Sequence, residues 1–147
     1  MPSDDARHRT KVYLEEHVNN ANLTEDDDST TVKFIVAYAF PDYPWLRVFQ
    51  DKSVSLVFAV DTPETEALPV AVGYLENVPI TIWCINKAGI SGTKLRWKAE
   101  AELRRVAETY PVSSLRTLTR LTDNEKNLGS TVLYSVTYNL RYKRYVT

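Results

Sequence analysis

The sequence has few of the residues on which catalytic and metal sites most often depend. Cys84 is its only cysteine, so the chain can form no internal disulfide and no cysteine-rich zinc site. Its four glycines and the absence of a Gly-x-Ser-x-Gly motif argue against a phosphate-binding loop or a serine nucleophile. The two histidines, His8 and His17, stand nine positions apart and do not match the spacing of metal ligands on one helix. We therefore expect no enzymatic activity, no catalytic residues, no metal and no cofactor.

Long apolar runs are also missing. No window of about 18 apolar residues occurs, so we expect no transmembrane helix and no membrane partner. The first residues are polar and acidic and lack the apolar core of a secretion signal, and a single thiol fits a reducing cytoplasm. The length of 147 residues, with 44% hydrophobic and 25% charged residues, predicts one globular domain over residues 1–147.

The net charge of −1 conceals an uneven distribution along the chain. Residues 1–75 contain 6 Lys/Arg and 13 Asp/Glu, whereas residues 76–147 contain 12 Lys/Arg and 6 Asp/Glu. A total near zero argues against a surface built throughout to bind nucleic acid. The asymmetry instead favours self-association, because the basic face of one copy can meet the acidic face of the next.

The pattern of apolar residues and chain breakers predicts two helices among several strands. Helices are expected over residues 4–20 and 93–109. The acidic segment 61–69 is expected to be a loop, and 123–130 to be the turn of a C-terminal hairpin. This order predicts an α+β fold with an N-terminal helix, a mostly antiparallel sheet packed by one long helix, and a C-terminal β-hairpin. The expected strands cover 32–40, 53–60, 70–75, 79–86, 115–122 and 131–145.

Periodicity assigns faces to the long helix and to the strands. One side of helix 93–109 is expected to pack on the sheet, through Leu95, Ala99, Leu103, Val106 and Tyr110. The other side is expected to face solvent, with Lys94, Lys98, Glu102, Arg105 and Glu108. Exposed ion pairs are expected between Glu100 and Arg104 and between Arg104 and Glu108. Strand 131–145 alternates strictly, with one apolar face made of Val132, Tyr134, Val136, Tyr138, Leu140 and Tyr142. Strand 79–86 is apolar on both faces and is expected to be central.

Three groups of residues are candidates for binding. The acidic run 25–28 lacks the spaced ligands and the turn glycine of a calcium loop, so we interpret it as a solvated loop. Tyr43 and Trp45 lie in an expected loop, where they fit either an interface or a local core. Arg141, Lys143 and Arg144 alternate with tyrosines, a pattern found in proteins that bind single-stranded nucleic acid. Because the total charge is not basic, we favour a solvent-facing or partner-facing role for these cations.

The order of elements resembles that of the tail terminator, or tail completion, proteins of tailed phages and related archaeal viruses. Those proteins share an N-terminal helix, a Pro-initiated strand, a Val/Ile-x-Ile-x-Trp strand, a helix rich in Ala, Glu, Leu and Arg, and a closing hairpin. The matching segments are Leu68 to Gly73, Val78 to Cys84, Lys94 to Thr109 and Gly129 to Arg144. The aromatic loop 41–52 has no counterpart in that pattern.

The resemblance implies a structural protein of the virion, assembled in the host cytoplasm. Such a protein forms a ring, commonly of six copies, by head-to-tail contacts at the junction of tail and head. Its partners would be further copies of itself, the tail-tube and connector proteins, and DNA in passage only. The residues expected at the contacts between copies are Tyr43, Trp45, Arg141, Lys143 and Arg144. Arg141 and Lys143 are also the candidates to face the channel or its nucleic acid.

Two other classes of function stay open. One is a small cytosolic ligand- or protein-binding α+β domain, whose apolar pocket in a monomer would be lined by Trp83, Tyr134 and Tyr138. The other is an enzyme with paired carboxylates in a cleft, for which the nearby residues are Glu64, Glu66 and Glu76. We favour the structural protein, since the acidic segment that carries Glu64 and Glu66 is typical of a soluble loop.

Overall fold

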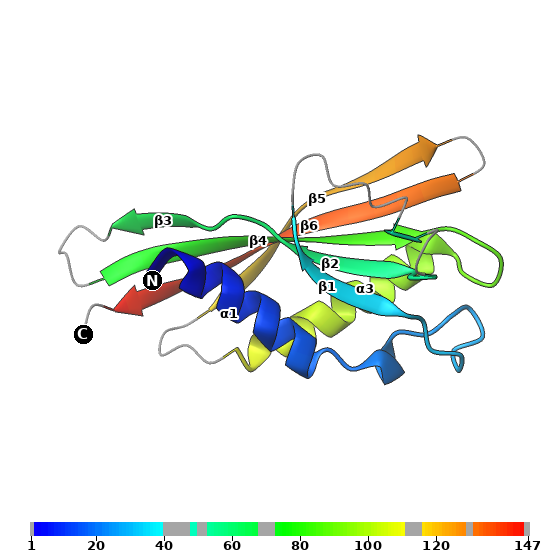
Figure 1. Ribbon diagram of the computed structural model, residues 1–147, viewed down its shortest axis with the longest axis horizontal. Coiled ribbons are helices and arrows are strands. Elements are labelled where there is room, and N and C mark those ends of the chain that lie inside the picture. Colours follow the sequence, from blue (N-terminus) through cyan, green and yellow to red (C-terminus); the bar gives the residue numbers. More distant parts are fainter. Residues whose placement is uncertain are drawn as a thin grey trace.

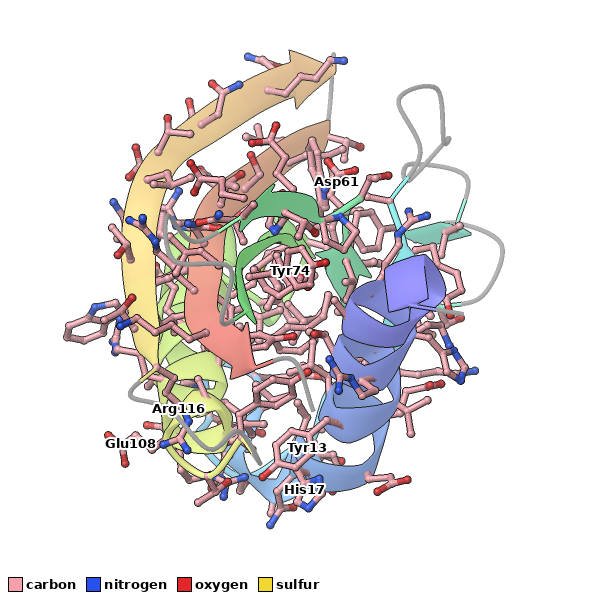
Figure 2. All side chains as sticks on the ribbon, turned by 90° about the vertical axis from the view of Figure 1, so that its left-hand side faces the viewer. Tyr13, His17, Asp61, Tyr74, Glu108 and Arg116 are labelled. Atoms are coloured by element: carbon pink, nitrogen blue, oxygen red, sulfur yellow. The ribbon has the colours of Figure 1, made fainter. Side chains whose placement is uncertain are left out.

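Two long helices cover one face of a single sheet (Figure 1). The computed structural model describes residues 2–39, 48–49, 53–67, 73–110, 116–128 and 131–145. Helix α1 spans Pro2–His17, a short 3-10 helix η1 spans Asn20–Asn22, and helix α3 spans Gly92–Glu108. The sheet curves around the two helices when it is seen from its end (Figure 2). The predicted α+β class is confirmed.

The sheet is mixed but mostly antiparallel, and its six strands follow the order β1-β2-β4-β6-β5, with β3 paired to β4 off this path. The strands are β1 Phe34–Tyr38, β2 Leu56–Val60, β3 Glu64–Ala67, β4 Gly73–Ile85, β5 Thr117–Leu128 and β6 Thr131–Tyr145. Only the pair β1–β2 is parallel among the described strands. The predicted central position of strand 79–86 is confirmed, because β4 lies between β2 and β6.

Two predictions about the middle of the chain were wrong. The acidic segment 61–69 was expected to be a loop, yet residues Glu64–Ala67 form β3 and pair with the first part of β4. The segments 70–75 and 79–86 were expected to be separate strands, yet β4 runs without interruption over Gly73–Ile85. Strand β3 forms because β2 ends at Val60 and leaves the first half of β4 without a partner on that side. It fills this place despite its charged composition. Strand β4 is continuous because β6 pairs with it over its whole length.

Pro79 lies inside β4, where proline is normally excluded because it cannot donate a hydrogen bond. Its carbonyl accepts a hydrogen bond from the Asp61 N–H at 2.9 Å. In a strand, the N–H and C=O of one residue point to the same side, so the missing N–H faces the same edge as that carbonyl. At this edge β2 has ended and β3 has not begun, since the β2 pairing stops at Ile80 and the β3 pairing starts at Asn77. Proline at this position therefore costs only the bond that an N–H would have donated to the Asp61 carbonyl, at the very end of the β2–β4 ladder.

The main core lies between the inner face of the sheet and the two helices. All five residues expected to face the sheet from the long helix are buried: Leu95, Ala99, Leu103, Val106 and Tyr110. The alternation predicted for β6 holds over Val136, Tyr138, Leu140 and Tyr142, which are buried in this core. At the beginning of the strand it is weaker, because Val132 and Tyr134 are half-buried and Leu133 of the opposite face is buried in a second apolar cluster. Cys84 is buried beside them, and burial raises the pKa of its thiol far above the ordinary value. The thiol is therefore a core group without the reactivity of a thiolate.

Helix α1 is shorter than predicted and buries one row of residues. It ends at His17, not at residue 20, and the chain continues through η1. The residues buried along it are Ala6, Thr10 and Leu14, which are four positions apart. The Thr10 hydroxyl bonds the Ala6 carbonyl at 2.7 Å and lies 3.1 Å from the Tyr110 hydroxyl, so a polar side chain is accommodated in the core.

The C-terminal hairpin is longer than predicted. Residues 123–130 were expected to form its turn, but residues up to Leu128 belong to β5 and pair with the beginning of β6. A register shift between Arg120 and Thr122 leaves Leu121 as a bulge, with 57% of its surface exposed. Polar residues suffice for this part of β5, because the long strand β6 supplies a complete row of hydrogen-bonding partners and no core covers the edge.

The start of α3 is fixed by groups from other loops. Ser91 is the N-cap residue, but its side chain makes no capping hydrogen bond. Instead, the Asp26 carboxylate accepts from the Ser91 N–H at 2.9 Å, and the Asn86 side-chain oxygen accepts from the Gly92 N–H at 3.0 Å. These acceptors satisfy donors that a helix leaves open at its N-terminus.

Gly92 is required by the packing of the Tyr134 ring. A Cβ atom at this position would lie 2.3 Å from Cδ2 of Tyr134, far inside van der Waals contact. We expect Gly92→Ala to lower the free energy of unfolding by about 1–2 kcal/mol, since overpacking outweighs the better helix propensity of alanine. Chemical denaturation would measure this loss. The loss should shrink in a Gly92→Ala/Tyr134→Ala double variant compared with Tyr134→Ala alone, and an unchanged loss would contradict the clash.

Candidate functional site

The structure describes only part of the set of predicted interface residues. Tyr43 and Trp45 lie outside the described residues, and Arg144 belongs to β6 with a side chain that is not described. Arg141 and Lys143 are exposed on the face of β6 that points away from the helices. Their neighbours on β4 are Asn77 and Leu75, respectively.

The structure brings some basic and acidic residues of the two halves of the chain together. Arg141 Nη2 lies 3.9 Å from the carboxylate of Glu66 on β3. Lys98 Nζ lies 2.8 Å from the carboxylate of Asp28. The contrast between an acidic and a basic half is thus partly neutralised within one chain.

The acidic loop is built around the ammonium group of Lys98. Besides Asp28, Lys98 Nζ donates to the carbonyls of Thr24 and Glu25 at 3.1 and 2.8 Å and to the Thr24 hydroxyl at 3.0 Å. The hydrogen bond from the Thr30 hydroxyl, together with those from the backbone N–H groups of residues 29 and 30, lowers the pKa of Asp27 to about 2. The run 25–28 is a loop with exposed side chains, as predicted, but it is a structured one.

A buried carboxylate joins α3 to the edge of the sheet. Glu100 has only 4% of its surface exposed, and its Oε1 accepts from Arg120 Nε at 2.7 Å and from the Tyr138 hydroxyl at 2.5 Å. Arg96 Nε lies 3.7 Å from the second carboxylate oxygen. Burial, followed by the hydrogen bond to Glu100, raises the pKa of Tyr138 to about 12. We call Glu100, Arg96, Arg120 and Tyr138 the Glu100 cluster.

The exposed ion pairs predicted along the helix, Glu100–Arg104 and Arg104–Glu108, were wrong. Glu100 faces β5 and bonds Arg120, and Arg104 donates to the Tyr138 hydroxyl at 2.8 Å. The reason is the orientation of α3, which turns position 100 toward the edge of the sheet. Helical spacing alone brings charges close enough to pair but gives no information about partners on another strand.

Glu102 was expected to face solvent, but only 2% of its surface is exposed. Its carboxylate accepts from Arg105 at 2.6 and 2.8 Å, from the Asn19 N–H at 2.7 Å and from the Asn22 side chain at 2.9 Å. Burial by itself would raise the pKa of Glu102, but these hydrogen bonds outweigh it and hold the pKa below the ordinary value. Glu102 therefore ties α3 to the segment that follows α1.

An open cavity of about 540 Å³ lies where α1 ends. It is lined by Glu16, His17, Val18, Asn19, Asn20, Phe34 and Arg105. The His17 ring stacks on Tyr13 with 3.9 Å between ring centres, and Figure 2 shows both side chains at this end of the molecule. His17 Nδ1 lies 3.0 Å from the Tyr13 carbonyl, which can only accept, so Nδ1 carries the hydrogen and Nε2 stays available.

The pocket and the cleft considered from the sequence are not formed by the residues named for them. Trp83 pairs with Ser135 and belongs to the outer face of the sheet, whereas Tyr134 and Tyr138 point to the inner face, so the three cannot line one pocket. Glu64 and Glu66 are exposed, but Glu76 is buried. Within the described residues, no group of three or more His, Cys, Asp or Glu side chains could hold a metal ion.

A surface that the sequence reasoning missed lies on the outer side of α3. Trp97 exposes 73% of its surface, and it shares this side with the exposed residues Lys94, Ala101, Arg104 and Glu108. We call these five residues the α3 stripe. One signal could have revealed it, because position 97 falls outside the spacing of Leu95, Ala99 and Leu103. An aromatic residue off the buried face of an amphipathic helix marks a candidate contact.

No protein-family model matches this chain, and no curated protein matches it. None of the helices in the described part of the chain has the length and apolar composition needed to cross a membrane.

Proposed function

We propose that this chain is a structural virion protein, similar to the tail terminator proteins, that assembles with further copies by head-to-tail contacts into a ring. Six copies is the expected number, and the tail-tube and connector proteins are the expected neighbours. The protein would take its place in the virion after assembly in the host cytoplasm. It acts by shape and contact, with no enzymatic step.

The observation that carries this proposal is the open edge strand β5. It pairs only with β6 among the described residues, and every described side chain from Thr117 to Asn127 is exposed or half-exposed. Leu118 is the one hydrophobic side chain of β5 that packs against the main core in the described structure. Figure 1 shows the hairpin of β5 and β6 rising away from the helices. A twelve-residue strand that adds so little to the core is suited to contact another chain.

A head-to-tail contact requires two different surfaces on the same chain. The two ends of the strand order meet this requirement, since β5 forms one edge of the sheet and β1 the other. Addition of a strand from a neighbouring copy to β5 would use main-chain hydrogen bonds, which need no particular side chains. This explains how a polar strand such as Thr117–Leu128 can serve as a contact.

Arg141 and Lys143 are the residues we propose to face the channel of such a ring. They are exposed on the outer face of β6, beside the half-exposed polar residues Asn139 and Thr137. A polar surface with scattered cations lets DNA pass without holding it, because few phosphate contacts give weak, salt-dependent binding.

Paired proline substitutions test the edge. Neighbouring residues in a strand direct their N–H groups to opposite sides, so of Asn124 and Glu125 one donates to β6 and the other points outward. Proline at the outward position should leave the unfolding midpoint near that of the wild type but abolish the formation of rings, as measured by sedimentation velocity. Asn124→Ala and Glu125→Ala, which keep the N–H, should assemble normally. If both proline variants fold and still form rings, the proposal that copies assemble through the β5 edge is wrong.

The second candidate is a small binding domain, and the cavity beside His17 is the observation that favours it. Its volume of about 540 Å³ falls in the range of small-molecule sites. The Arg105 guanidinium is already committed to Glu102, whereas His17 Nε2 can bind a ligand, beside Glu16 and Asn20 of the same lining. A protein that is monomeric at all concentrations would favour this candidate over the ring.

A further inference from the structure

The α3 stripe has the spacing of a helix–helix contact. Its five residues, Lys94, Trp97, Ala101, Arg104 and Glu108, follow one another at intervals of three and four positions. This spacing keeps side chains on one line along a helix and is the one used at the seam of paired helices. All five are exposed, and Figure 2 shows Glu108 on the side of α3 that points away from α1. The line is therefore open to a partner along four turns of helix.

The stripe is complementary to itself when a second copy is reversed. Ala101 stands at its centre, and positions equally far from Ala101 would face each other in an antiparallel pair. Lys94 then meets Glu108 of the second copy, and the same ion pair recurs at the other end. Trp97 lies four positions before Ala101 and therefore comes opposite position 105 of the second copy, next to Arg104, whose guanidinium can stack on the indole ring. The small side chain of Ala101 lies at the crossing, where two helices approach most closely.

We infer that α3 binds α3 of a second copy of this chain, antiparallel and about a two-fold axis through Ala101. The contact is isologous, since each residue meets the partner's counterpart from the same stripe. It goes beyond the proposed ring, because a two-fold contact pairs copies and does not continue head to tail. A single helix pair buries a small area, so the contact belongs to the weak class of interfaces below about 1,200 Å².

Within the described residues, contacts inside the chain engage only part of the α3 stripe. Arg104 uses one guanidinium nitrogen to donate to Tyr138, which leaves the face of its guanidinium plane available. The Arg116 side chain donates to the backbone carbonyl of Glu108, and this hydrogen bond does not involve the Glu108 carboxylate. Trp97 exposes more of its surface than any other large hydrophobic side chain in the described structure, at 73%. Exposed tryptophan between two cations and beside a small residue is suited to a protein contact.

Charge exchange across the two-fold axis tests the inference. Lys94→Glu and Glu108→Lys should each weaken dimer formation at least tenfold in sedimentation equilibrium, because each places like charges at both ends of the stripe. The double variant exchanges the charges and should restore the wild-type dissociation constant to within about threefold. Lys87→Glu, a change of an exposed lysine outside the stripe, is the matched control and should have no effect. Trp97→Ala should abolish the dimer.

The outcomes separate this inference from the proposed ring. In the folded proline variant that no longer assembles through β5, the α3 dimer should persist. A wild-type protein that forms rings but responds to none of the stripe variants would overturn the α3 contact and leave the ring standing. A double variant as weak as the single ones would also overturn it, because the pairing of Lys94 with Glu108 would then be wrong.

Discussion

Replacing Glu100 with alanine is expected to lower the free energy of unfolding by about 3–5 kcal/mol and to loosen β5 from the rest of the sheet. The carboxylate is 4% exposed and is the common acceptor for Arg120 and the Tyr138 hydroxyl. Without it, the Tyr138 hydroxyl loses its acceptor, and the largely covered guanidinium of Arg96 keeps only its second carboxylate neighbour, Asp123 at 3.5 Å. The cost is large because buried polar groups are left without a partner.

The effect on β5 should exceed the effect on the central strands. In the described structure, β5 is held to the body by its pairing with β6, by Leu118, by the bond between Arg120 and Glu100, and by an ion pair between Arg96 and Asp123 at 3.5 Å. Urea denaturation would measure the loss of stability, and hydrogen exchange would show whether β5 amides lose protection more than β4 amides. Glu108→Ala is the matched control, since this exposed glutamate of the same helix should change stability by less than about 0.5 kcal/mol. A Glu100→Ala variant within that same range would refute the anchoring role.

Replacing Glu102 with glutamine is expected to cost about 2–3 kcal/mol at neutral pH. Glutamine keeps the length of the side chain but loses the charge that accepts from Arg105, the Asn19 N–H and Asn22. The pKa of Glu102 is held below its ordinary value of 4.5 in the folded protein. A carboxylate with a lowered pKa stabilises the fold at pH values above its unfolded pKa, and this contribution is lost as the pH falls through the folded pKa.

The difference in stability between wild type and Glu102→Gln should therefore be largest near neutral pH and shrink below about pH 4.5. Thermal or urea unfolding at several pH values would measure it. Glu108→Gln serves as the control, because an exposed carboxylate without these partners should show no such dependence. A gap that stays constant from pH 7 to pH 3 would mean that the charge of Glu102 has no part in holding η1 to α3.

The sequence predicts those parts of the fold in which one face of an element is covered. The apolar spacing of Leu95, Ala99 and Leu103 and the alternation of β6 both follow from burial against a single core, so periodicity suffices to assign them. The strand β3 could not be assigned in this way, because Glu64–Ala67 is charged and becomes a strand only where β4 has an unpaired edge. Strand β3 forms because β2 ends before it reaches the first half of β4, and no local sequence pattern shows where β2 ends.

The contacts of the candidate surfaces were still harder to predict. Glu100 and Glu102 are acidic residues on an amphipathic helix, and such residues are expected in solvent. Their burial depends on partners 20 to 83 positions away, Arg120 and Asn19, whose proximity is a product of the fold. Trp97 carried a usable signal, because its position breaks the apolar spacing of its helix. The other predicted contacts, Tyr43 and Trp45, fall outside the described residues.

The central claim is that this chain functions by assembling with copies of itself. Native mass spectrometry over a range of protein and salt concentrations, with negative-stain images of the same samples, tests it most directly. We predict ring-sized assemblies of about six copies that weaken as salt rises, to the extent that charges meet between copies. A chain that stays monomeric at every concentration and at low salt, with no rings in the images, would contradict the account.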